Sequence, residues 1–85
     1  MLREIEELAA LAPNWDGYGA DKFAAETLRH ADCILRGLRQ RYDVEVTPNP
    51  NATVTLEWDW DSEHYILEIG KSLISGCVKA NKSTQ

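Results

Sequence analysis

Several features that mark particular classes of protein are scarce or missing in this 85-residue sequence. It has no apolar run near the ~18 residues of a membrane-spanning helix and no signal segment at its start, so we expect a cytoplasmic protein that does not enter a membrane. Its only two cysteines, Cys33 and Cys77, show no Cys-x-x-Cys spacing. We expect free thiols buried on core-facing elements, with a disulfide or a metal pair as the alternatives.

Positive charge is missing from about a third of the chain. No Lys or Arg occurs between Asp43 and Ile69, although the rest of the chain holds all 9 of them together with 7 acids. The segment contains seven carboxylates: Asp43, Glu45, Glu57, Asp59, Asp61, Glu63 and Glu68. With a net charge of −5, direct binding to nucleic acid or to an anionic membrane is disfavoured, and a partner with a basic protein surface is favoured.

The same segment alternates between apolar and polar residues. Val54, Leu56 and Trp58 fall on one parity while Thr55 and Glu57 fall on the other, which is the period of a half-buried strand. The pattern predicts strands over Asp43–Val46, Ala52–Trp60 (with Ala52 and Trp60 inward) and a third ending at Ile69 with Tyr65 and Leu67 inward. A fourth strand is expected over Leu73–Lys79 with Ile74 and Val78 inward, and turns are expected at Thr47–Asn51, Asp61–Glu63 and Gly70–Ser72.

Two helices are predicted before these strands. Met1–Leu11 carries apolar residues at helical spacing and ends at Pro13, and a longer helix runs from a capping Asp21 to about Tyr42. The predicted fold class is therefore α+β, with two N-terminal helices packed on one face of a three- or four-stranded antiparallel sheet. We expect one domain over residues 1–80 and a flexible tail over 81–85.

The stretch from Ala12 to Ala20, APNWDGYGA, lies between the predicted helices. Its Asn, Asp and Gly residues are typical of turns, and the structural interpretation is that its aromatics fill the gap between the helices. The functional interpretation is that Trp15, Asp16 and Tyr18 contact a partner, because aromatic residues are common interface anchors.

No pattern of catalytic or metal-binding residues stands out. Asp59, Asp61 and Glu63 have the first spacings of a calcium loop, but His64 and Gly70 occupy the positions that require Gly and Glu. His64, like the other histidine, reads as an ordinary half-exposed residue. We expect no enzyme, cofactor or metal, and a small hydrolase that uses the carboxylates is the least favoured alternative.

The candidate binding residues are the acids of the strands: Asp43, Glu45, Glu57, Asp59, Asp61 and Glu68. Acids two residues apart on a strand lie about 6.8 Å from each other, and neighbouring strands lie about 4.8 Å apart. A negative grid at this spacing can replace a phosphate backbone in a basic groove. The plainer alternative is that these acids only keep one face of the sheet solvated.

The string Asn14–Ala20, followed by a helix and by the strands Leu56-Glu57-Trp58 and Ile66–Ile69, resembles a largely uncharacterised group of small bacterial and prophage proteins with an NWDGxGA loop. The resemblance covers residues 11 to 70 and implies no catalytic residues. In size and acidity alone, the chain is similar to anti-CRISPR inhibitors.

These observations lead to two functional hypotheses. In the first, the chain is a phage-encoded inhibitor of the anti-CRISPR type, a monomer or weak homodimer in the host cytoplasm. By DNA mimicry it would occupy a basic, nucleic-acid-binding surface of a host defence complex such as a CRISPR effector. In the second, it is an antitoxin or assembly subunit that binds a protein partner through the Asn14–Ala20 loop.

Overall fold

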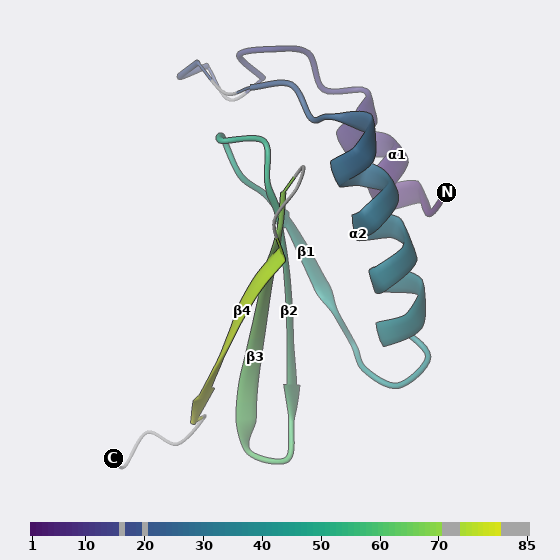
Figure 1. Ribbon diagram of the computed structural model, residues 1–85, viewed down its shortest axis with the longest axis vertical. Coiled ribbons are helices and arrows are strands. Elements are labelled where there is room, and N and C mark those ends of the chain that lie inside the picture. The colour runs from purple at the N-terminus through teal and green to yellow at the C-terminus, as the bar shows by residue number, and fades with distance from the viewer. Residues whose placement is uncertain (16, 20, 71–73, 81–85) are drawn as a thin grey trace.

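Two helices and a four-stranded antiparallel sheet make up the computed structural model, which describes residues 1–15, 17–19, 21–70 and 74–80 (Figure 1). The elements in chain order are α1 (Arg3–Ala9), α2 (Ala25–Leu38), β1 (Glu45–Pro48), β2 (Val54–Trp60), β3 (Glu63–Ile69) and β4 (Ile74–Ala80). The strands lie in the order β1-β2-β3-β4, so each pairs with its neighbour along the chain. The α+β prediction is confirmed in this form. Most of the predicted third turn and the predicted tail lie outside the described residues.

Both helices are shorter than the sequence pattern indicates. The N-cap of α2 is Ala24, with no side-chain cap, so the predicted cap at Asp21 is wrong. The Asp21 N–H instead donates to the Pro50 carbonyl over 2.8 Å, which ties the entry to α2 to the β1–β2 connection. Beyond Leu38 the chain turns toward β1, so the predicted end at Tyr42 is four residues too late.

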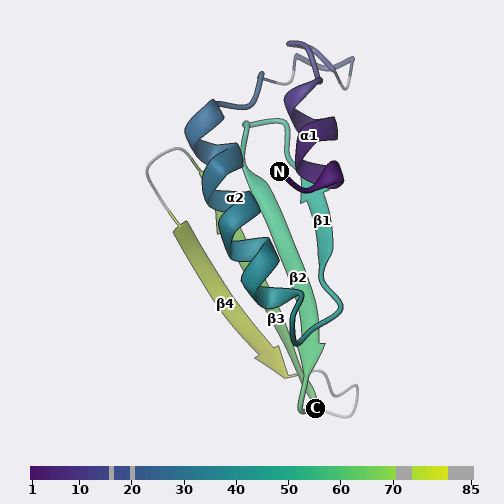
Figure 2. The same cartoon turned by 90° about the vertical axis from the view of Figure 1, so that its right-hand side faces the viewer.

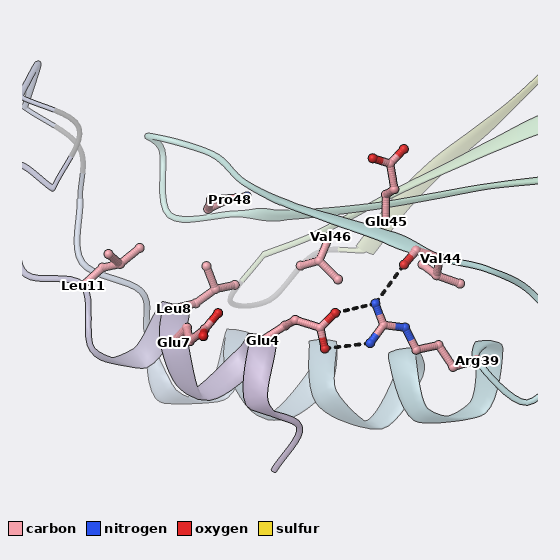
Figure 3. A pocket seen from close by; sticks show the side chains of 9 residues that line it. All are labelled: Glu4, Glu7, Leu8, Leu11, Arg39, Val44, Glu45, Val46 and Pro48. Atoms are coloured by element: carbon pink, nitrogen blue, oxygen red, sulfur yellow. Dashed lines mark hydrogen bonds and ion pairs between the residues drawn. The ribbon is translucent and has the colours of Figure 1, made fainter.

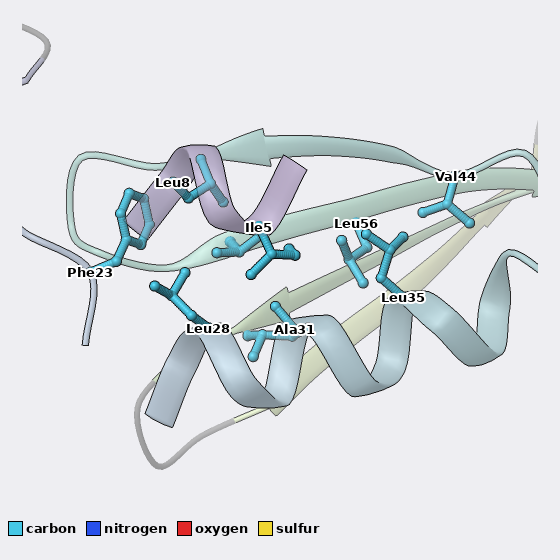
Figure 4. Close-up of a cluster of buried hydrophobic side chains, with 10 residues drawn as sticks. Ile5, Leu8, Phe23, Leu28, Ala31, Leu35, Val44 and Leu56 are labelled. Carbon is cyan, nitrogen blue, oxygen red and sulfur yellow. The ribbon is translucent and has the colours of Figure 1, made fainter. Parts of the chain in front are cut away.

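The core lies between α1, α2 and the face of the sheet that the helices cover, here called the inner face (Figures 1 and 4). Leu28, Ala31 and Leu35 of α2 are buried against it, as the helical spacing predicts. Val54 and Leu56 of β2 are also fully buried, which confirms the predicted alternation. Register places Leu67 beside Leu56, but Leu67 is only half-buried.

The helices do not cover the whole inner face. In Figure 2, β4 lies beside α2 rather than beneath it, and α2 packs against β2 and β3. Ile74 and Val78, predicted to point into the core, are therefore 48% and 52% exposed, and Trp60 at the end of β2 is 54% exposed. The alternation in the strands predicted the correct side of the sheet for these side chains. A side chain on that side is buried, however, only where another element covers it.

Both cysteines are exposed free thiols, so their predicted burial is wrong. Cys33 is two residues from both Ala31 and Leu35, which places it on the opposite side of α2 from these core residues. Cys77 alternates with Gly76 and Val78 on β4, and it therefore belongs to the face of the sheet away from the helices.

Candidate functional site: the outer face of the sheet

Four of the six predicted binding residues share the face of the sheet that points away from the helices, here called the outer face. Glu45 of β1 pairs in register with Glu57 of β2, and Asp59 lies two residues further along β2. Glu68 of β3 pairs with Thr55, on the same side. Because the buried Val54 and Leu56 alternate with these positions, the carboxylates project to the helix-free side.

The other two predicted residues lie beside this face rather than on it. Asp43 is exposed just before β1. Asp61 and Ser62 form the two-residue connection between β2 and β3, with φ of 53° and 66°. Two successive positive φ angles are typical of the tight hairpin turns that match the twist of paired strands. This turn sets the register of the hairpin, in which Asp59 lies opposite His64.

His64 is the charged residue of the outer face whose contacts the sequence reasoning missed. Its Nε2 lies 2.9 Å from Glu57 Oε2 and its Nδ1 lies 2.7 Å from Asp59 Oδ1. Ionised carboxylates only accept hydrogen bonds, so both contacts are satisfied at once only by the doubly protonated ring. The hydrogen bonds to Glu57 first and to Asp59 second raise the pKa of His64 above its ordinary value. A protonated His64 therefore neutralises part of the outer face.

Glu45 and Glu57 form a directly opposed pair of like charges. Such cross-strand pairs destabilise a sheet, by up to about 1 kcal/mol. Only Glu57 has His64 as a counter-charge, while the Glu45 side chain is exposed. Solvation alone does not require two acids at opposed positions, since Thr47 and Thr55 fill the next such pair without charge.

Among the described residues, a network of polar side chains holds Glu68. Its Oε2 lies 2.7 Å from the Thr53 hydroxyl, and the Asn49 side-chain amide donates to the hydroxyls of Thr53 and Thr55 over 3.0 and 2.8 Å. The end of the β1–β2 hairpin therefore orients this carboxylate. Beside it, a shallow hollow of about 220 Å³ is lined by Ile66, Glu68, Ser75, Gly76 and Cys77.

The loop that provides the alternative site divides into a packed part and an exposed part. Trp15 is half-buried, stacks on Phe23 with ring centroids 6.0 Å apart, and donates from Nε1 to the Asp21 carbonyl over 3.2 Å. Its predicted packing role is confirmed. Tyr18 is 93% exposed, so the prediction that it fills the same gap is wrong. Asp16 lies outside the described residues.

Within the described part of the chain, no group of three or more His, Cys, Asp or Glu side chains is arranged to hold a metal ion. Over the same residues, neither helix is long and apolar enough to cross a membrane.

Comparisons with known proteins identify no relative of this chain. The sequence matches no protein-family model and no curated protein, and the fold matches no solved structure. The fold and its outer face define a small α+β protein with a carboxylate-rich sheet surface.

Proposed function

We propose that this protein is a non-catalytic binding protein whose outer face docks on a basic surface of another protein. The observation that carries the proposal is that Glu45, Glu57, Asp59 and Glu68 converge on the helix-free side of the sheet. Opposing Glu45 and Glu57 costs folding stability, so this arrangement is better explained by recognition than by stability. Clustered charge of one sign increases the rate of encounter with a surface of opposite sign.

A narrower form of the proposal is that the partner surface is one that normally binds nucleic acid. Glu57 and Asp59 are separated by about 6.8 Å along the strand, and the strands lie about 4.8 Å apart, so the face presents anionic oxygens in rows. A surface that binds the phosphates of nucleic acid through Lys and Arg recognises the same charge. In this form, the protein is a phage-encoded inhibitor that occupies the nucleic-acid groove of a host defence complex such as a CRISPR effector.

The test compares two variants with the same change in charge. In the double variant Glu45→Gln and Glu68→Gln, the contacts of His64 stay intact. Its control is Glu6→Gln with Glu26→Gln, because these two acids are exposed on the helices. Each exposed charge pair contributes about 0.2 to 1 kcal/mol, so we expect the outer-face variant to bind about 2- to 30-fold more weakly while its melting temperature stays equal or rises.

Binding would be measured against a purified guide-loaded CRISPR effector, with and without its target DNA. DNA mimicry predicts that target DNA competes with the protein and that affinity falls as salt is raised. Equal binding by the parent and the outer-face variant would reject docking through this face. Salt-sensitive binding that target DNA leaves unchanged would reject mimicry and keep the broader proposal.

A second candidate function rests on the exposure of Tyr18. An aromatic ring that is 93% exposed in the Asn14–Ala20 loop is a natural anchor for a protein partner, as in an antitoxin or an assembly subunit. Tyr18→Ala would then abolish partner binding without changing the melting temperature. Trp15→Ala, by contrast, should destabilise the fold through loss of its stacking on Phe23.

A further inference from the structure

A groove lies between α1 and the open edge of β1, and Glu45 is the one outer-face carboxylate among its lining residues (Figure 3). The groove is open to solvent and has a volume of about 470 Å³. One wall is a stripe along α1 and the turn after it, formed by Glu4, Glu7, Leu8 and Leu11 at helical spacing. The other wall is formed by Val44, Glu45, Val46 and Pro48, and Arg39 closes one end.

The edge of β1 beside this groove has backbone groups that β2 does not use. The Asn49 N–H donates to the Thr53 carbonyl over 2.9 Å, which makes these residues a hydrogen-bonded pair. Hydrogen-bonded and non-hydrogen-bonded pairs alternate along an antiparallel ladder, so Val46, opposite Leu56, belongs to a non-hydrogen-bonded pair. The N–H and C=O of Val46 therefore point outward, toward the open edge.

Features on either side of Val46 limit which part of this edge another strand can use. Pro48 has no N–H, so it offers only its carbonyl. At the other end, Arg39 Nη2 donates to the Val44 carbonyl over 2.9 Å. The same guanidinium makes two bonds of 2.7 and 2.6 Å to the Glu4 carboxylate, which fixes it in place. An incoming strand can therefore form main-chain hydrogen bonds only along a short stretch of this edge, centred on Val46.

The side chains of the groove indicate what kind of segment fits there. Leu8, Leu11 and Val46 are apolar and suit an apolar side chain. Three carboxylates, Glu4, Glu7 and Glu45, surround them, and Arg39 is the single cation among the lining residues, so the groove keeps a net charge of −2. Arg39 lowers the pKa of Glu4 through its hydrogen bonds, so Glu4 is ionised at neutral pH. The groove is therefore complementary to an apolar residue flanked by cations.

We propose that this groove binds an extended, basic segment of a partner protein, which adds a fifth strand to the edge of β1. The segment's central residue exchanges hydrogen bonds with Val46 and inserts an apolar side chain toward Leu8, while a neighbouring Lys or Arg lies beside Glu45. Main-chain hydrogen bonds then provide affinity, and the groove selects alternate side chains. The site goes beyond the proposed outer-face function, because it uses the backbone edge of β1 and the side chains of α1, and Glu45 is the only carboxylate that the two surfaces share.

The probe is the pentapeptide Leu-Lys-Leu-Lys-Leu, whose central leucine is flanked by two lysines. It is titrated to millimolar concentration into the ¹⁵N-labelled protein. We expect the amide resonance of Val46 to shift most among the strand residues. Glu7→Lys should weaken binding about 5-fold or more, because Glu7 lines the groove and the change places a positive charge at short range from the cations of the peptide, where the Coulomb energy is largest. The control Glu6→Lys makes the same change on the adjacent position of α1, outside the groove lining, and should change affinity less than 2-fold.

A change in the ligand tests the backbone contact without altering the protein. Methylating the central leucine nitrogen removes the N–H that would donate to the Val46 carbonyl, and binding should be lost. The inference is overturned if the Val46 resonance does not move, if the methylated peptide binds equally well, or if Glu6→Lys and Glu7→Lys weaken binding to the same extent. Shifts that map to Glu57, Asp59 and Glu68 would likewise place the peptide on the outer face and reject the groove.

Discussion

Replacing Leu56 by alanine is the most direct test of how the sheet is packed. Leu56 is fully buried at the centre of β2, between Val46 of β1 and Leu67 of β3 in register, and it faces Leu35 of α2 (Figure 4). Removing its methyl groups leaves a cavity that this small core fills only partly. The variant should therefore lose both the transfer free energy of the deleted carbons and the packing of the three neighbours.

The size of the effect follows from the burial. Fully buried Leu→Ala changes cost about 2.7 to 5 kcal/mol, and the half-buried Val46 and Leu67 have room to relax, so we expect about 3 kcal/mol. At about 0.05 to 0.15 kcal/mol per residue, the whole chain has a free energy of unfolding of only about 4 to 13 kcal/mol. Each kcal/mol shifts the melting temperature of such a domain by about 4 to 8 °C, which gives a fall of about 12 to 24 °C.

The assay is thermal and urea unfolding followed by circular dichroism, with Ile66→Ala as the matched control. Ile66 is half-buried on the outer face, opposite Glu57 and beside Cys77, so its truncation should cost about 1 kcal/mol or less. The urea m-value should stay unchanged if only the native state is affected. If Ile66→Ala proves more damaging than Leu56→Ala, the assignment of the inner and outer faces is wrong.

Three further tests concern single side chains. Because Glu57 and Asp59 raise the pKa of His64, their contacts stabilise the fold fully below its ordinary value near 6.5, and this contribution is lost as pH rises through the raised pKa. The difference in melting temperature between the parent and His64→Gln should therefore shrink from about pH 6 to about pH 9, and a difference that stays constant would contradict these contacts. The buried Thr27 hydroxyl has no hydrogen-bond partner among the described residues, so Thr27→Val should leave the free energy of unfolding in urea unchanged or raise it by up to ~1 kcal/mol. A clear loss would reveal a bond to that oxygen. Cys33 and Cys77 should both react with a thiol reagent in the native protein, and a thiol that reacts only after denaturation would show that its side chain is covered.

The two periodicities that the sequence carries were sufficient to predict the types of element and their order. Leu28, Ala31 and Leu35 recur at helical spacing and lie on the buried side of α2, while Val54 and Leu56 alternate with polar residues and lie on the buried side of β2. These patterns are local, because a side chain's direction follows from its position along its own helix or strand. The placement of Glu45, Glu57, Asp59 and Glu68 on one side of the sheet followed from the same rule.

Contacts between elements were decided only by the tertiary structure. The acidic pattern of the strands gave no reason to place a cation among them, yet the tight turn at Asp61 and Ser62 brings His64 opposite Asp59 and within 2.9 Å of Glu57. The ion pair between Arg39 and Glu4 joins residues 35 positions apart, and it depends on how α1 packs beside the end of α2.

The sequence pattern also did not predict which strands of the sheet the helices cover. Ile74 and Val78 have the parity of core residues, but they stay about half exposed because α2 packs over β2 and β3 and leaves β4 uncovered. Cys33 lies on α2, which contributes one side to the core, yet its side chain lies on the exposed side of that helix. Sequence periodicity determines which way a side chain points, whereas burial and ion pairing depend on which element lies across from it, and that is settled only when the whole chain has packed.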